Sequence, residues 1–449
     1  MVEHLFGSDE LFFSTTDSQG RIRRANSTFM RLSGHPRGTL VGRAHNVVRH
    51  ADMPAGLFRS VWETIEAGGA ACAYITNRSA DGGHYRVFAT IVPSGTGYLS
   101  VRTLPMLTDL RDQVEGAYAR ILEVERSSTA AGSTRREAAT AGQAALHAEL
   151  ESLGYRDAAD FTRQILPEEV AALLASGVGI PDHRAGDGPV ARILDAMNAI
   201  EEDTSELMGV LDEGRRLVGL LDRRAEEIDA LSQRLGQLRA ALRTAVSDVE
   251  RLGAGPEAED VATSCATVDD LVLECHEQLH PLRGQVAELR ADVDAVRFGI
   301  ALLRLHNLAA GMFSLQIIQG EDEVDANDAV GSLEELCTAL HEDAGALVER
   351  IDLLAARSEL VGGELDTVAK ALTDTHAPLL DLLGAAADAG AAQEISVRTA
   401  RSLVRDGFPE ARDLADLAGS LRDLEIPYEP ERIEERLAEV RQALASLMR

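Results

Sequence analysis

Short apolar stretches separated by turn-forming residues fill the first hundred positions of the chain. This pattern predicts strands at 11–16, 21–24, 72–79, 84–93 and 97–102, with turn chemistry at 17–20 and 81–83. Asn26 suits the N-cap of a short helix that ends near Ser33 and Gly34. A second helix should follow Pro54, since one face of it carries Leu57, Phe58, Val61, Trp62 and Ile65.

After residue 105 the apolar residues recur every three or four positions, which predicts helices. A helix over about 106–150 would leave the first segment as a signal helix, although a polar stretch at 127–145 interrupts its apolar face. Residues 151–190 are less regular and include a glycine-bearing loop at 177–189 that lacks the P-loop spacing. The heptad pattern is clearest between 190 and 252, at Leu221, Ile228, Leu235, Leu242 and Val249.

Four further helices are expected in the rest of the chain. They span about 261–318, with a break expected at His280-Pro281, then 329–390, 392–422 and 429–448. Together these patterns predict antiparallel packed helices or a coiled coil that forms a homodimer.

Composition divides the 449-residue chain at the same place. Residues 1–102 hold ten of the seventeen aromatic residues and a net charge of +3. The remaining 347 residues carry a net charge of −33, so the whole chain has a charge of −30. The acidic surface argues against binding to nucleic acid, because a phosphate backbone requires basic side chains.

The four cysteines (Cys72, Cys265, Cys275, Cys337) lack the spacing of a disulfide framework or a zinc site. With no apolar run of about 20 residues and no secretion signal, we expect a cytoplasmic protein without a membrane span.

The element order of the first segment, β-β-α-α-α-α-β-β-β, is that of a PAS domain. The expected fold class is therefore α+β, a five-stranded antiparallel sheet with helices, followed by a mainly α-helical coiled-coil or bundle region. Four segments are expected: a PAS sensor domain at 1–105, a signal helix and irregular linker at 106–190, long antiparallel helices at 191–390, and C-terminal helices at 391–449.

Motifs within residues 10–105 make the resemblance closer. They include Ala25-Asn26-x-Thr28-Phe29, His45-Asn46-x-Val48-Arg49-His50-x-Asp52-Met53-Pro54, Phe58-x-x-x-Trp62, Asn77-Arg78 and Gly97-Tyr98-x-Ser100-x-Arg102-Thr103. This segment resembles the PAS domain of bacterial aerotaxis receptors. The resemblance implies noncovalent FAD, whose redox state reports oxygen or respiratory energy status to a chemoreceptor-type helical region.

The resemblance also implies a set of flavin-contacting positions. They fall on Asn26, His45, Arg49, His50, Asp52, Phe58, Trp62 and Asn77. Their chemistry is compatible with the flavin, because Arg49 could pair with a pyrophosphate, Trp62 could stack on a ring, and Asn77 offers both a donor and an acceptor.

Other readings of these residues stay open. Arg49 and Asp52 could instead pair with each other, with Asp52 capping a helix, as a purely structural feature. The spacing of His45, His50 and Asp52 could ligate a metal, and His50 or His84 could hold a heme. Three positions depart from the family pattern, where Ala51 replaces a proline and Ala71 and Arg86 replace large aromatics. The last two replacements could enlarge the pocket or weaken flavin binding.

The sequence of the helical region does not identify its binding partner. Residues 305–310, ahead of a turn near 319–328, are similar to the kinase-contacting tip of chemoreceptors, but the family's dense tip motif is absent. A chemotaxis kinase or adaptor complex and a different partner are both open. No ATP-binding or cyclase unit follows, so we expect no enzyme. The alternative to a flavin sensor is a dimeric PAS interaction scaffold without flavin, or with heme or another small ligand.

Overall fold

The computed structural model describes residues 2–181, 188–252, 256–320, 326–388 and 391–447. These residues form two compact units. The first unit comprises 1–212, 295–349 and 427–449, and the second comprises 213–294 and 350–426. Parts of the glycine-bearing loop expected at 177–189 and of the turn expected near 319–328 lie outside the described residues, at 182–187 and 321–325.

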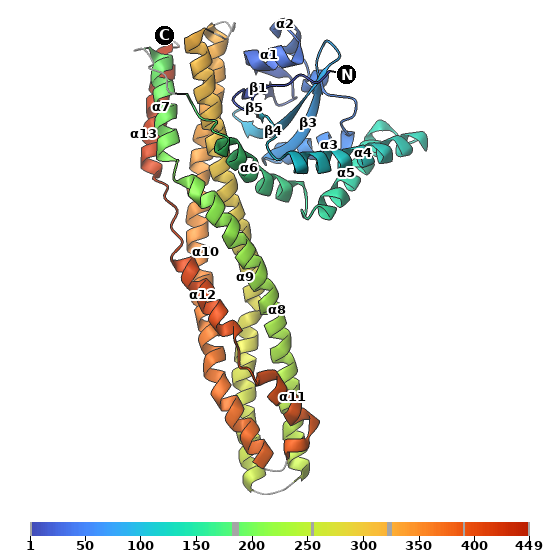
Figure 1. Cartoon of the computed structure of the whole chain (residues 1–449), viewed down its shortest axis with the longest axis vertical. Helices are drawn as coiled ribbons and strands as arrows, with labels where there is room; N and C mark the ends of the chain where they lie inside the picture. The colour runs from blue at the N-terminus through green and yellow to red at the C-terminus, as the bar shows by residue number, and fades with distance from the viewer. Residues whose placement is uncertain (1, 182–187, 253–255, 321–325, 389–390, 448–449) are drawn as a thin grey trace. The chain divides into compact units, whose positions relative to one another are not determined.

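A five-stranded antiparallel sheet forms the N-terminal part of the first unit (Figure 1). Its strands are β1 (Phe12–Asp17), β2 (Ile22–Ala25), β3 (Ala71–Arg78), β4 (His84–Ser94) and β5 (Gly97–Thr103), in the order β2-β1-β5-β4-β3. Between β2 and β3 lie α1 (Ser27–Ser33), α2 (Arg37–Leu40), the 3₁₀ helix η1 (His45–Val48) and α3 (Ala55–Glu66). The predicted PAS architecture is confirmed.

Local chemistry explains the boundaries of these elements. The side chain of Asn26 accepts a hydrogen bond from the Phe29 amide, and Gly34 adopts the left-handed conformation that ends α1. In the sheet, side chains alternate between two faces because the strand period is two. On the face turned toward α1, Phe12 stacks with Phe29 at 6.0 Å between ring centroids, and Tyr85 packs beside them.

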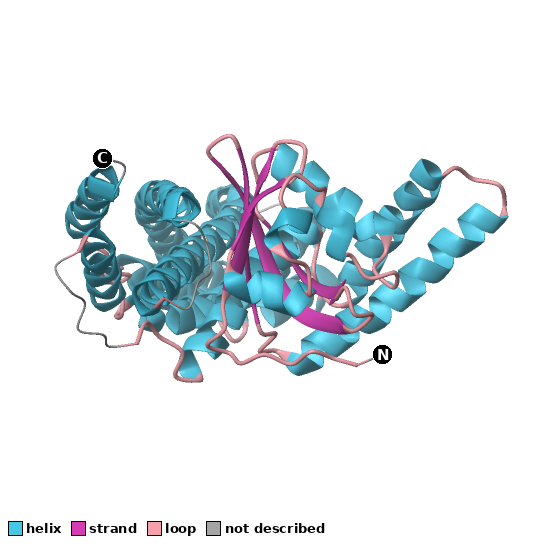
Figure 2. Ribbon diagram, turned by 90° about the horizontal axis from the view of Figure 1, so that it is seen from above, coloured by secondary structure: helices cyan, strands magenta, loops and turns pink. Residues whose placement is uncertain are grey.

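The expected single helix over 106–150 is wrong, because the structure has a helical hairpin there. α4 (Thr108–Ala130) is followed by Gly132, which has a φ of +96°, and α5 (Arg135–Ser152) begins at a capping box between Thr134 and Glu137. Figure 2 shows this hairpin extending beside the sheet. Arg120 of α4 pairs with Glu149 of α5, so the two helices run antiparallel.

The hairpin packs closely on α3. A Cβ atom on Gly56 of α3 would lie 2.2 Å from the backbone carbon of Gly142 in α5, so both positions depend on the absence of a side chain. The next helix, α6 (Ala158–Ala175), covers part of the opposite sheet face, where Phe161 meets Tyr74 of β3 edge-to-face.

Long helices make up most of the remaining chain. They are α7 (Pro189–Asp203), α8 (Leu207–Leu252), α9 (Pro256–Gln319), α10 (Ala326–Asp388), the short η2 (Ala391–Gln393), α11 (Ile395–Val404), α12 (Glu410–Arg422) and α13 (Pro430–Leu447). The predicted break at Pro281 is wrong, since α9 continues through it. Within the second unit the predicted heptad residues of α8 are buried, Leu221 and Leu235 among them, and Arg239 pairs with Asp269 at 3.0 Å.

The first unit also holds the end of α9 against the sheet. Phe313 of α9 meets Phe13 of β1 edge-to-face, with 5.0 Å between centroids, and Arg24 of β2 pairs with Glu335 of α10. Residues 305–310, which the sequence analysis compared with a chemoreceptor tip, are buried in this unit, as are residues 311–315 after them. In this structure their side chains are therefore covered.

α9 corrects one expectation about membranes. By length and composition, Asp260–Gln319 contains a stretch apolar enough to cross a membrane, although the sequence analysis expected no such stretch. The apolar window is entirely buried in the structure, as in the core helix of a bundle.

Candidate ligand-binding cavity

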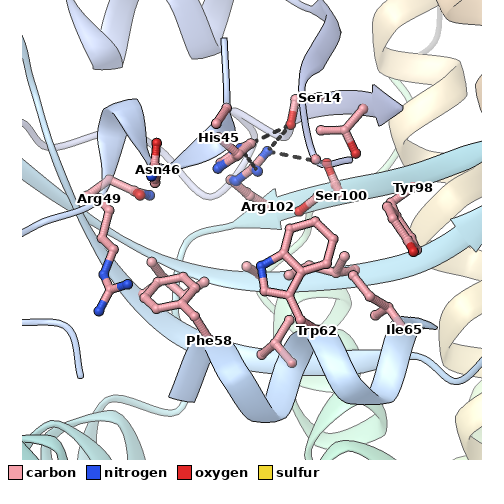
Figure 3. Close-up of a pocket in the computed structure, with 18 of the residues that line it drawn as sticks. Ser14, His45, Asn46, Arg49, Phe58, Trp62, Ile65, Tyr98, Ser100 and Arg102 are labelled. Carbon is pink, nitrogen blue, oxygen red and sulfur yellow. Dashed lines mark hydrogen bonds between the residues drawn. The ribbon is translucent and has the colours of Figure 1, made fainter. Parts of the chain in front are cut away.

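A cavity of about 410 Å³ lies between the sheet and α3 (Figure 3). Its volume falls within the range of about 300–1,000 Å³ that is usual for small-molecule sites. Alternate residues of the strands form its floor, as the two-residue strand period requires: Ser14 and Thr16, Ile75 and Asn77, Ala89 and Ile91, and Tyr98, Ser100 and Arg102. α3 and the segment around η1 supply the opposite wall.

Five of the eight positions implied by the family resemblance line this cavity. They are His45, Arg49, Phe58, Trp62 and Asn77. The other three do not line it. Asn26 caps α1, while the His50 ring lies 6.0 Å from the ring of His84 and close to the exposed carboxylate of Asp52. The structural reading of Arg49 and Asp52 is wrong as well, since Pro54 occupies the N-cap position of α3 and the carboxylate of Asp52 lies beside His50.

Aromatic rings from α3 form the apolar wall of the cavity. Trp62 meets Tyr98 edge-to-face at 5.5 Å between centroids. The guanidinium of Arg49 lies 4.2 Å from the centroid of Phe58 and donates a hydrogen bond of 2.6 Å to the Met53 carbonyl oxygen. Arg49 therefore belongs to the wall and does not pair with Asp52.

Two polar groups on the cavity floor lack partners. The amide nitrogen of Asn77 and the hydroxyl of Ser100 are both buried and form no hydrogen bond with the described residues. Buried donors are normally satisfied, because an unpaired one costs about 1–3 kcal/mol. A ligand with acceptor atoms would satisfy both.

Arg102, at the end of β5, was missed as a site residue by sequence reasoning. It donates to the Ser14 hydroxyl at 3.1 Å, to the Ser100 carbonyl at 3.3 Å and to His45 Nε2 at 2.6 Å. Figure 3 shows these bonds converging beside the cavity. Burial lowers the pKa of Arg102 to about 10, so the guanidinium stays charged at neutral pH. The alternation of Tyr98, Ser100 and Arg102 could have identified it.

His45 is held neutral by the same arrangement. Removal from water and the neighbouring Arg102 charge lower the pKa of His45 to about 3, against an ordinary value of 6.5. Its Nε2 therefore accepts a hydrogen bond from Arg102, and the proton of the neutral ring lies on Nδ1.

His45 should make the stability of the first unit depend on pH. Its folded-state pKa is depressed, so between pH 6.5 and 3 the unfolded chain binds more protons and stability falls as pH falls. We expect a loss of up to about 1.4 kcal/mol per pH unit below 6.5. Urea unfolding of His45→Gln at pH 7, 6 and 5 should show a flatter dependence than wild type. The control His147→Gln removes an exposed histidine and should retain the wild-type slope.

The metal and heme readings find no support in the geometry. Among the described residues, no group of three or more His, Cys, Asp or Glu side chains lies close enough to hold a metal ion. Neither His50 nor His84 lines the cavity. Of the positions that depart from the family pattern, Arg86 lies on the other face of β4, where it pairs with Glu3 and Glu115, so its replacement does not enlarge this cavity. Ala71 does not line the cavity, but it lies opposite Ile91, which does, and therefore faces the same side of the sheet.

Over 100 residues, the chain is 41% identical to the aerotaxis receptor of Escherichia coli (strain K12). The match covers 21% of this chain and 20% of that receptor, so the chain spans about a fifth of the length of the curated relative it matches. No protein-family model matches the chain. The similarity has the length of one PAS domain, and it supports the resemblance read from the motifs over that length.

The cavity residues fit the ring system of a flavin. A planar ring with polar edges needs flat apolar walls, which Phe58 and Trp62 provide, and donors for its carbonyl oxygens and ring nitrogens. The unpaired amide nitrogen of Asn77 and the hydroxyl of Ser100 are such donors. Arg49 and Arg59 also line the cavity and are cations suited to a pyrophosphate.

Proposed function

We propose that this chain is a cytoplasmic signal-transduction protein whose PAS domain binds FAD and senses redox state or oxygen. The observation that carries the proposal is the aromatic-walled cavity with unpaired buried donors, in a PAS fold that is similar to part of an aerotaxis receptor. A bound flavin would supply reversible electron transfer, and no other group of this site has that chemistry.

The roles of the residues follow from their positions. Trp62 and Phe58 orient the ring and exclude water from it. Asn77 meets a polar edge of the ring through its amide, and the adjacent backbone bridge between Arg49 and Asn77 keeps that amide in place. A change in hydrogen bonding at Asn77 is then transmitted to β3.

Two buried carboxylates support a route from the cavity to the helices. Glu125 of α4 accepts hydrogen bonds from the amides of Ala55 and Gly56 at the start of α3. Glu169 of α6 accepts from the Tyr74 hydroxyl of β3 and from the amides of Met106 and Leu107, which link β5 to α4. A displacement of β3, β5 or α3 changes these contacts, so we expect the α4–α5 hairpin to receive the signal.

The helical region would then provide the output as a homodimer that acts on a chemotaxis kinase or adaptor complex. Because residues 305–315 are buried, with Phe313 against Phe13 of β1 and Asn307 hydrogen-bonded to Met197 of α7, a partner that contacts this segment would need it released. Release on a redox change would couple the sensor to the output.

Asn77→Ala tests the cavity as a flavin site. Purified wild-type protein should be yellow and contain FAD, and Asn77→Ala should bind FAD about 3- to 10-fold more weakly, because one buried hydrogen bond is lost. Fluorescence titration of the apoprotein measures both affinities. Asn198→Ala on α7, which does not line the cavity, is the control and should match wild type. A wild-type protein that binds no FAD would contradict the proposed function.

A further inference from the structure

Arg102 differs from the other buried arginines of the described chain. Arg297 and Arg304 are also almost fully buried, and each pairs with a carboxylate, Glu168 at 2.6 Å and Glu201 respectively. Arg102 is 3% exposed, and within the described residues it forms no ion pair. Burying an unpaired charge is costly, so its retention calls for a physical reason.

The groups that contact Arg102 in the described part of the chain are neutral. Its hydrogen-bond partners are a hydroxyl, a backbone carbonyl and the neutral ring of His45, and its guanidinium lies 5.1 Å from the centroid of Phe29. These contacts fix its position, but none of them offsets its positive charge.

The cavity beside Arg102 has a marked excess of positive charge. Its lining residues include Arg49, Arg59 and Arg102 and no Asp or Glu, and of these three only Arg59 forms an ion pair within the described residues, with Glu63 at 2.8 Å. The unpaired donors of Asn77 and Ser100 lie on the same floor. Such a cavity favours a ligand that presents acceptor atoms and negative charge.

We propose that Arg102 is a ligand-binding residue that contacts an electron-rich edge of the bound ring and favours the form of the ligand with more negative charge. This inference rests on the proposed function. When FAD takes up two electrons and one proton from an external donor, its ring gains one negative charge, and the Arg102 guanidinium stabilises that charge. The reduction potential of the bound flavin is then higher than without Arg102.

Because His45 is neutral, the effect on the reduction potential of the flavin comes from one cation, Arg102. Because His45 accepts a hydrogen bond from Arg102, it holds the guanidinium at the floor of the cavity without adding a second charge. Arg102 also joins β5 to β1 through Ser14, so a change in its contact with the ligand reaches the strand that leads into α4.

The test measures the midpoint potential of FAD bound to the full chain, with xanthine and xanthine oxidase as the electron source and a reference dye as the standard. In wild type we expect the bound potential to lie above that of free FAD. Arg102→Gln should lower it by at least about 30 mV, which is a tenfold weaker preference for the reduced form, while Arg102→Lys, which keeps the charge, should stay near wild type. Arg86→Gln, whose arginine pairs with Glu3 and Glu115 away from the cavity, is the matched control and should leave the potential unchanged.

The outcomes separate this inference from the proposed function. If bound FAD has the same potential in Arg102→Gln and wild type, Arg102 is only structural and the inference fails while the flavin site stands. Should Arg102→Gln not fold, a wild-type potential at or below that of free FAD would overturn the inference by itself. Wild-type protein that binds no FAD overturns both.

Discussion

Replacement of Glu169 by alanine should lower the free energy of unfolding of the first unit by about 3–5 kcal/mol. The buried carboxylate of Glu169 accepts three hydrogen bonds, from Tyr74 at 2.7 Å and from the amides of Met106 and Leu107 at 2.7 and 3.1 Å. Alanine would leave these donors unpaired at a cost of about 1–3 kcal/mol each, reduced where water enters. Amide hydrogen exchange at 106–112 and in β3 should measure the loss, because it reports the stability of each segment separately.

Glu169→Gln should be intermediate, with a loss of about 1–3 kcal/mol. The single carbonyl oxygen of glutamine can still accept from Tyr74 and Leu107, but its –NH2 group then faces the Met106 amide, which is also a donor. Glu151→Ala, an exposed glutamate beside His147, is the control and should leave exchange unchanged. An alanine variant with wild-type exchange at 106–112 would contradict the role of Glu169 in fixing the start of α4.

The PAS domain could be predicted from the sequence because its information is local. The turns at 17–20 and 81–83, the cap at Asn26 and the apolar face of α3 each act within a few residues, and each was found where expected. The helical hairpin also has a local signal in the sequence, since Gly132 is a helix stop and Thr134 with Glu137 forms a capping box, both within the polar stretch at 127–145.

The candidate site was predictable only in part, for a physical reason. The family resemblance supplies positions, but whether a side chain faces the cavity depends on tertiary packing. His50 and Asp52 follow Arg49 closely in sequence, yet they do not line the cavity because the chain leaves η1 in an extended conformation. Arg102 could have been identified from the sequence, since it continues the alternation of Tyr98 and Ser100 along the strand. The contacts of Glu169 join residues more than 60 positions apart, and no local pattern encodes them.

Glu125→Ala should have the second large effect, and it should act on the cavity. The carboxylate of Glu125 caps α3 from α4, accepting from Ala55 at 2.9 Å and from Gly56 at 2.7 Å. α3 has no capping side chain of its own, because Pro54 occupies its N-cap position. The negative charge also interacts favourably with the positive end of the helix dipole. Without it we expect a loss of about 2–4 kcal/mol and faster amide exchange in the first turn of α3.

Because α3 carries Phe58 and Trp62, the same variant should bind FAD more weakly although Glu125 does not line the cavity. Glu123→Ala is the matched control, since Glu123 lies two residues earlier on the same helix and is exposed. It should retain wild-type stability and affinity. Gly142 lets Glu125 reach α3, because a Cβ there would lie 2.1 Å from the carboxylate oxygen. If Glu125→Ala weakened neither α3 nor FAD binding, the cavity would be independent of α4, and the proposed route from ligand to helical hairpin through Glu125 would be lost.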